Sequence, residues 1–156
     1  MRASATLSQT GLAVNAHGYV RLTYDVDLVI QLKAENIRPA FAALASLGYR
    51  PTVPVTADQF SDAAQRASWI RDKGMQVLNF ASDRHRPVTV DVFVTEPFDF
   101  DGEYQAALQG ELAPGLMVRF VSISTLIAMK QLDNRPRDLD DIEHLRMIVE
   151  EKRRDE

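Results

Sequence analysis

Cysteine is absent from this sequence of 156 residues. Its absence excludes disulfide bonds, thiol nucleophiles and cysteine-ligated zinc. Long apolar stretches are missing as well, since no run is long enough to span a membrane. The first six residues lack the apolar core of a secretory signal. Together these absences predict a cytoplasmic protein with no membrane partner.

An excess of positive charge is also lacking. Asp and Glu number 22 against 18 Lys and Arg, which gives a net charge of −4. This balance argues against a general-purpose nucleic-acid binder, although it leaves room for a local basic site. The hydrophobic content of 46% and the charged content of 26% are those of an ordinary globular protein. A chain of this length predicts one domain, residues 1–156, with a substantial core.

Hydrophobic periodicity supplies the expected elements. Alternation predicts strands over 21–30, 75–80, 88–94 and 117–121, with the middle two forming a hairpin. The proline-containing segment 50–55 suits a loop or a sheet edge, and 97–102 reads as an acidic loop. Helical spacing and caps predict helices over 11–16, 36–47, 59–71 and 125–132, and a last helix that opens at Asp138.

This order of elements predicts an α/β fold. We expect a small mixed twisted sheet with helices mainly on one face. Residues 1–121 would form the sheet-containing core, and residues 122–152 would supply two C-terminal helices that complete a cleft.

The strand over residues 21–30 carries the most informative pattern. Its alternation places Asp25 and Asp27 on one face and three apolar residues on the other, Val26, Leu28 and Ile30. Two neighbouring carboxylates repel, which raises at least one pKa unless a cation lies between them. A divalent metal such as Mg²⁺ is the natural occupant. The alternative is the solvent-facing side of an edge strand.

A third carboxylate, Asp91, lies on the second arm of the predicted hairpin. It converges on Asp25 and Asp27 if the two strands are sheet neighbours. Three carboxylates with two Mg²⁺ ions would bridge a triphosphate and lower the pKa of an attacking hydroxyl. The alternative for Asp91 is an exposed strand position near a hairpin.

These residues stand in a characteristic order. A turn and short helix, 11–18, precede Arg21-Leu22-Thr23 and then Asp25-Val26-Asp27. This order resembles the signature of the polymerase-β-like nucleotidyltransferase superfamily. Together with His17-Gly18 it resembles the small AbiEii-like nucleotidyltransferases, many of which are toxins of toxin–antitoxin pairs. The resemblance extends from Gly11 to about Leu145. It includes Asp91 as the third carboxylate and, near the end, Lys130 followed by Arg137-Asp138 and Asp141.

The resemblance implies transfer of a nucleoside monophosphate from an NTP to an acceptor hydroxyl. It implies Asp25, Asp27 and Asp91 as ligands of two Mg²⁺ ions, with Asp91 alternatively the base toward the acceptor. The acceptor would be a tRNA, a protein or a small molecule, and a toxin would have an antitoxin as its partner. The implied nucleotide-binding residues are Thr10 and Gly11 through their backbone, Arg21, Thr23, Lys130, Asp138 and Asp141.

Each of these assignments has a structural alternative. Lys130 could be a surface lysine, Arg21 could pair with a nearby acid, and Asp138 could be a helix cap. We interpret His17 as structural. The segment Arg84-His85-Arg86 could contact RNA or phosphate, but a charged hairpin turn explains it more simply.

Two departures from the family pattern favour a second function, a catalytically inactive nucleotidyltransferase-fold protein that binds a nucleotide or a protein partner. Thr10 stands where the family has the first glycine of the turn, which restricts the backbone near the phosphates. In addition, only ten residues precede the motif, so we expect a shortened first strand or a missing start. The intact set of Asp25, Asp27, Asp91 and Lys130 favours an active enzyme.

Overall fold

The computed structural model describes residues 6–8, 11–19, 23–114 and 116–155. Its contacts divide the chain into two compact units. The first unit comprises Met1–Leu7 and Tyr24–Glu96, and the second comprises Ser8–Thr23 and Pro97–Glu156. Residues 122–152 therefore group with the segment that precedes them. The number of domains stays a prediction.

The first unit contains strands in the order β3–β4–β5–β2. β2 (Asp25–Ile30) pairs in parallel with β5 (Thr89–Phe93). β5 pairs antiparallel with β4 (Val77–Ala81), and β4 pairs antiparallel with the short strand β3 (Arg50–Pro51). The predicted hairpin is thus β4–β5, and the mixed sheet is confirmed. β2 begins at Asp25, while the start of the expected strand at 21–22 lies outside the described residues.

Three helices complete the first unit: α2 (Ala34–Ser46), α3 (Ala57–Ser61) and α4 (Ala63–Lys73). The single helix predicted over 59–71 is wrong, because the chain breaks at Asp62. Asp62 adopts an extended backbone conformation, and its side chain accepts hydrogen bonds from the amides of Ala64 and Gln65. It therefore serves as the N-cap of a new helix.

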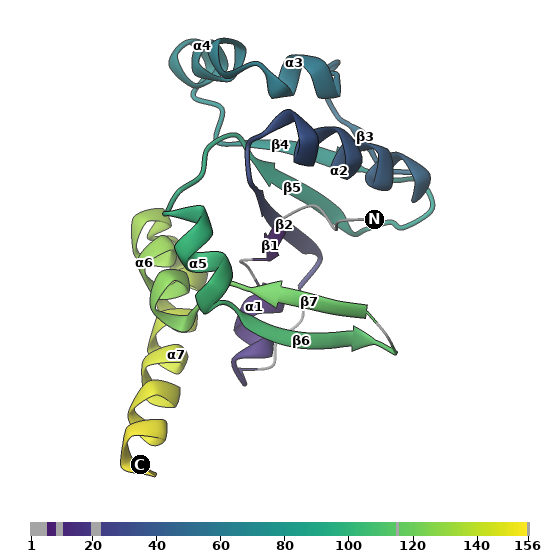
Figure 1. Ribbon diagram of the computed structural model, residues 1–156. Helices are drawn as coiled ribbons and strands as arrows, with labels where there is room; N and C mark the ends of the chain where they lie inside the picture. The colour runs from purple at the N-terminus through teal and green to yellow at the C-terminus, as the bar shows by residue number, and fades with distance from the viewer. Residues whose placement is uncertain (1–5, 9–10, 20–22, 115, 156) are drawn as a thin grey trace. The chain divides into compact units, whose positions relative to one another are not determined.

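The core of the first unit lies between these helices and one face of its strands (Figure 1). Val26 and Leu28 pack against it and Ile30 is buried within it, which confirms the predicted apolar face of the aspartate strand. Phe41 of α2 contacts the rings of Phe60 and Phe80, with centroids 5.4 and 5.2 Å away. Full burial of such a side chain stabilises the fold by about 1.5–3 kcal/mol. The face of the strands that packs against the helices is therefore the stable interior of this unit.

The second unit combines a hairpin with helices (Figure 1). β6 (Leu108–Ala113) pairs antiparallel with β7 (Leu116–Phe120), and Ser8, the last residue of β1 (Thr6–Ser8), pairs in parallel with Phe120. The helices are α1 (Gly11–Ala16), α5 (Phe100–Ala106), α6 (Ile123–Asp133) and α7 (Pro136–Arg154).

Two of these elements, α5 and β6, were not predicted. The expected loop over 97–102 instead opens α5, because the Asp99 carboxylate accepts a hydrogen bond from the Gly102 amide and caps the helix. β6 escaped notice because its sequence, Leu-Gln-Gly-Glu-Leu-Ala, has a central glycine and no β-branched residue. Its pairing with β7 overrides that weak propensity.

Polar contacts fix the ends of the C-terminal helices. The Ser122 hydroxyl accepts a hydrogen bond from the Thr125 amide and caps α6, which begins at Ile123, two residues before the predicted start. Asn134, in the left-handed conformation, ends α6, and Pro136 opens α7 two residues before the predicted start. His17 Nε2 lies 2.9 Å from the Val121 carbonyl oxygen, a structural contact. No helix among the described residues is long and apolar enough to cross a bilayer.

Candidate active site

The candidate residues fall into two groups, one in each unit. The first is a carboxylate face, which we define as Asp25, Asp27 and Asp91. In the parallel register of β2 and β5, Asp27 stands opposite Asp91 and Asp25 stands opposite Thr89. Neighbouring strands lie about 4.8 Å apart, and residues two apart on a strand share a face. The expected convergence of the three acids depended on these strands being sheet neighbours. They are neighbours, and all three residues lie on one face of the sheet.

Burial differs sharply along this face. Asp27 is only 8% exposed, Asp91 is half-buried and Asp25 is exposed. A carboxylate removed from water is costly unless hydrogen bonds or cations compensate it. The central acid of the face, Asp27, therefore depends on its polar surroundings more than its two neighbours do.

Two neutral side chains orient the outer carboxylates. The Thr89 hydroxyl donates a hydrogen bond to Asp25 Oδ1 at 3.1 Å. On the other side of β5, the Asn79 amide of β4 donates to Asp91 Oδ1 at 2.7 Å, and the two residues are register partners. Sequence reasoning missed Asn79 and Thr89. Only the hairpin register, which places Asn79 opposite Asp91, would have revealed the first.

The chemistry of this donor set suits a hard divalent cation, because all three ligands are carboxylates. In the described part of the chain, however, no three acidic or histidine side chains are arranged to hold a metal ion. Asn79 lies on β4, the neighbour of β5 on the side away from β2, and its hydrogen bond holds the Asp91 carboxylate toward that strand.

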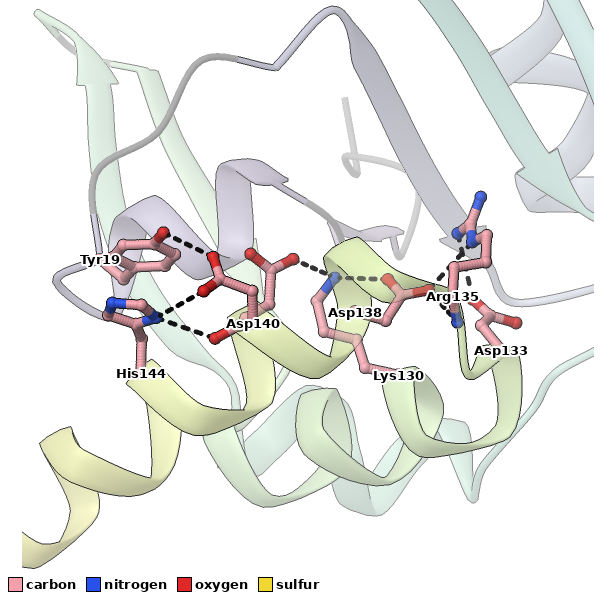
Figure 2. A network of polar contacts seen from close by, with 8 residues as sticks. Tyr19, Lys130, Asp133, Arg135, Asp138, Asp140 and His144 are labelled. Atoms are coloured by element: carbon pink, nitrogen blue, oxygen red, sulfur yellow. Dashed lines mark hydrogen bonds and ion pairs between the residues drawn. The ribbon is translucent and has the colours of Figure 1, made fainter.

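The second group surrounds Lys130 and belongs entirely to the second unit. Lys130 Nζ lies 3.2 Å from Asp138 Oδ1 and 2.7 Å from Asp141 Oδ2 (Figure 2). All three are buried, with 5%, 3% and 0% exposure. Arg135 adds a fourth charge, since its Nε donates to Asp138 Oδ2 at 2.9 Å. Arg135 also pairs with Asp133 at 3.4 Å, and both of these side chains are exposed. In the buried part of the cluster, Lys130 compensates Asp138 and Asp141, as buried charges require.

Asp138 has two duties in this cluster. Burial alone would raise the pKa of its carboxyl, but the hydrogen bond from Arg135 and the charge of Lys130 outweigh burial, and the pKa lies below its ordinary value. Asp138 also accepts from the Arg135 backbone amide at 3.2 Å, in the first turn of α7. The cap expected as an alternative to a site role is therefore present together with the ion pair.

A neighbouring contact fixes the segment after α1 to α7. The Tyr19 hydroxyl donates to Asp140 Oδ2 at 2.9 Å, and its ring stacks on His144 with centroids 3.9 Å apart (Figure 2). The face of α7 adjacent to the Lys130 cluster thus carries a second polar group. Its partners are all within the second unit.

Thr10 and Arg21 lie outside the described residues. Gly11 is the first residue of α1, and Thr23 is half-buried just before the start of β2. Their expected roles toward a nucleotide stay predictions.

Comparison with known proteins identifies the fold. A search of protein-family models and a search of curated proteins found no match. Among solved structures, the chain is similar to the lincosamide antibiotic adenylyltransferase LnuA in its lincomycin-bound form, with a TM-score of 0.54 and 11% identity. The match covers 92% of this chain and 86% of that chain. The chain therefore has a nucleotidyltransferase fold.

Proposed function

We propose that this protein is a metal-dependent nucleotidyltransferase that moves a nucleoside monophosphate from an NTP to an acceptor hydroxyl. The observation that carries the proposal is the register of Asp27 opposite Asp91, with Asp25 on the same face. An acidic face of this kind is expected where carboxylates hold Mg²⁺ ions, because the ions can then neutralise the charge of substrate phosphates. The likeness to an adenylyltransferase supports the same class of reaction.

Asp25, Asp27 and Asp91 would hold Mg²⁺. When bound, the ions would neutralise the charge of the transferring phosphoryl group and lower the pKa of the attacking hydroxyl. The alternative role of Asp91 is that of the base, because a carboxylate beside the acceptor can accept the hydroxyl proton instead of holding a metal ion. The Asn79 amide, which donates to Oδ1, leaves Oδ2 of Asp91 for that purpose.

Lys130 would position the nucleotide. An ammonium has three N–H donors, and Asp138 and Asp141 take two of them. The two carboxylates hold the Lys130 side chain in place near the end of α6, and they thereby set the direction of its third N–H donor. We propose that Lys130 contacts the triphosphate directly, and that Gly11 and Arg21 also contact the phosphates of the NTP.

The experiment that tests the metal–nucleotide site is calorimetric titration of each NTP, with and without Mg²⁺. The variant Asp25→Asn/Asp27→Asn removes two charges at nearly constant volume. Asp58→Asn/Asp72→Asn is the matched control, since both acids are exposed partners of surface arginines. We expect Mg²⁺-dependent binding in the wild type and the control, and its loss in the first variant. Equal binding in all three proteins would refute the proposal.

The orientation of Asp91 favours one alternative, a catalytically inactive protein that binds a nucleotide or a partner. Asn79→Leu separates the two functions because it removes the hydrogen bond that holds Asp91 toward β4. In an active enzyme, metal affinity should change in this variant. Unchanged Mg²⁺ and NTP binding, with no transfer of labelled nucleotide to any acceptor, would support the inactive alternative.

The toxin role and an antitoxin partner belong to the same proposal and rest on the AbiEii-like order of motifs. Induced expression in a bacterial host tests them. Growth arrest by the wild type, with normal growth of Asp25→Asn/Asp27→Asn at equal protein level, would support a toxin. Normal growth of both strains would argue for a different acceptor.

A further inference from the structure

A pocket of about 580 Å³ lies in the first unit, apart from the carboxylate face. Its walls come from segment 48–52, which includes β3, and from segment 81–89, which joins β4 to β5. Arg50 of β3 pairs with Ala81, the last residue of β4, so the two segments meet at the same end of these strands. The pocket is therefore built by the hairpin that carries Asp91.

Arginine dominates the charge of this pocket. Arg50, Arg84 and Arg86 line it, against one acid, Asp83. Asp83 pairs with Arg86, and both side chains are largely exposed, at 87% and 79%. Among the described residues, no carboxylate lies within ion-pair distance of Arg50 or Arg84. The pocket thus holds a local excess of two positive charges in a chain whose net charge is −4.

Ring stacking and a hydrogen bond hold the loop that carries Arg84 and Arg86 in place. The His85 ring stacks on Tyr49, with centroids 5.6 Å apart and planes 10° from parallel. Ser82, only 3% exposed, accepts a hydrogen bond from the Arg84 amide. Gly48, at φ +85°, leaves room for Arg84, because a Cβ there would lie 3.2 Å from Arg84 Cδ. Such bracing reduces the conformational entropy lost on binding an anion.

The pocket borders the carboxylate face at one residue. Thr89 lines the pocket, and its hydroxyl donates to Asp25. A molecule seated among the arginines would therefore reach the strand position next to the proposed metal ligands. This adjacency lies wholly within the first unit.

We propose that this pocket binds a phosphate ester of the acceptor substrate. Guanidinium groups match phosphate oxygens in geometry and charge. A pocket with this excess of positive charge therefore favours an anionic acceptor over a neutral one. The inference rests on the proposed function, which assigns the NTP phosphates to Gly11 and Lys130 of the other unit. The acceptor is then a phosphorylated molecule, either a nucleic-acid strand or a small phosphate ester.

The test measures acceptor binding without NTP, by fluorescence anisotropy of a fluorescein-labelled single-stranded RNA. Inorganic phosphate and AMP serve as unlabelled competitors. The variant Arg84→Gln/Arg86→Gln removes two positive charges from the pocket. Arg38→Gln/Arg71→Gln is the charge-matched control on exposed helix positions of the same unit. Circular dichroism checks that both variants remain folded.

We expect Arg84→Gln/Arg86→Gln to weaken RNA binding about tenfold, as for loss of charged hydrogen bonds, with little change in the control. The slope of the logarithm of the binding constant against the logarithm of the salt concentration should also fall in magnitude by about 1.4, which is about 0.7 for each of two lost phosphate contacts. Binding of AMP or phosphate alone, with the same dependence on arginine, would support the pocket and identify a small phosphorylated acceptor. Neither RNA nor phosphate binding, or equal loss in both variants, would overturn the inference.

NTP calorimetry on the same variants separates this inference from the proposed function. The arginine variant should bind Mg²⁺–NTP as the wild type does. Loss of NTP binding would overturn the acceptor assignment and place the nucleotide in the pocket instead. Absence of NTP binding in the wild type would refute the transferase, while the anisotropy result would still decide whether the pocket binds phosphate.

Discussion

Lys130→Met is the perturbation whose outcome follows most directly from the structure. It removes an ammonium that lies 3.2 and 2.7 Å from two carboxylates with 3% and 0% exposure. Removing one partner from a buried ion cluster costs about 3–5 kcal/mol in the free energy of unfolding. For a chain of this size, each kcal/mol shifts the melting temperature by about 2–4 °C. We therefore expect a fall of roughly 6–20 °C.

Urea unfolding followed by circular dichroism measures the loss, and a double-mutant cycle shows its origin. Asp141→Leu combined with Lys130→Met replaces the cation and one of its anions by apolar side chains. The double variant should be more stable than Lys130→Met alone, since an apolar replacement of a buried pair is often neutral or stabilising. A loss below about 1 kcal/mol in Lys130→Met would refute the reasoning.

The pH dependence gives an independent check on the same cluster. Because the pKa of Asp138 is lowered in the folded state, its contribution to stability is present above its ordinary value of 3.8 and is lost as the pH falls through the folded value. Lys130 is one cause of that shift. In Lys130→Met the acid-induced loss attributable to Asp138 should therefore begin at a higher pH than in the wild type. Identical acid profiles would contradict the assignment.

Three further predictions concern local structure in the first unit, each measured by urea unfolding. Asp62→Ala should cost about 1 kcal/mol by removing the cap of α4, whereas Asp72→Ala, at an exposed pair, should be nearly neutral. Gly48→Ala should destabilise more than Gly74→Ala, because both have positive φ but only Gly48 has side chains within 4 Å of the added Cβ. Phe60→Ala should cost about 3–5 kcal/mol, since its side chain is fully buried in the core. Reversal of either paired ranking, or a Phe60→Ala loss below about 1 kcal/mol, would contradict the packing described above.

Sequence patterns predicted the parts of the fold that depend on strong local signals. The alternation around Asp27 and Asp91 gave both strands and their apolar faces. The helix expected over 125–132 corresponds to α6, which begins two residues earlier. The break at Asp62 was missed because both flanking segments favour a helix. β6 was missed because only its partner strand stabilises it. The propensity of a segment taken alone contains no information about the strand that pairs with it.

The candidate site shows the same division. The positions of the acids could be predicted, because a resemblance and a two-residue period suffice to place them on one face. The partners Asn79 and Thr89 could not, since each depends on the register between two strands. The arginine pocket could not be predicted either. Arg50 lines it from β3, an edge strand of only two residues, and its position depends on the register between β3 and β4.

The sequence distances within the two charged groups differ greatly, and this has a consequence for the order of folding. Lys130 and Asp138 are eight residues apart, so the corner between α6 and α7 closes through a short loop. Asp25 and Thr89 are 64 residues apart, and their strands meet only after a long parallel crossover. We expect the lysine cluster to gain hydrogen-exchange protection before the carboxylate face. A partly folded chain would thus carry no assembled acidic face, because that face forms only when β5 pairs with β2.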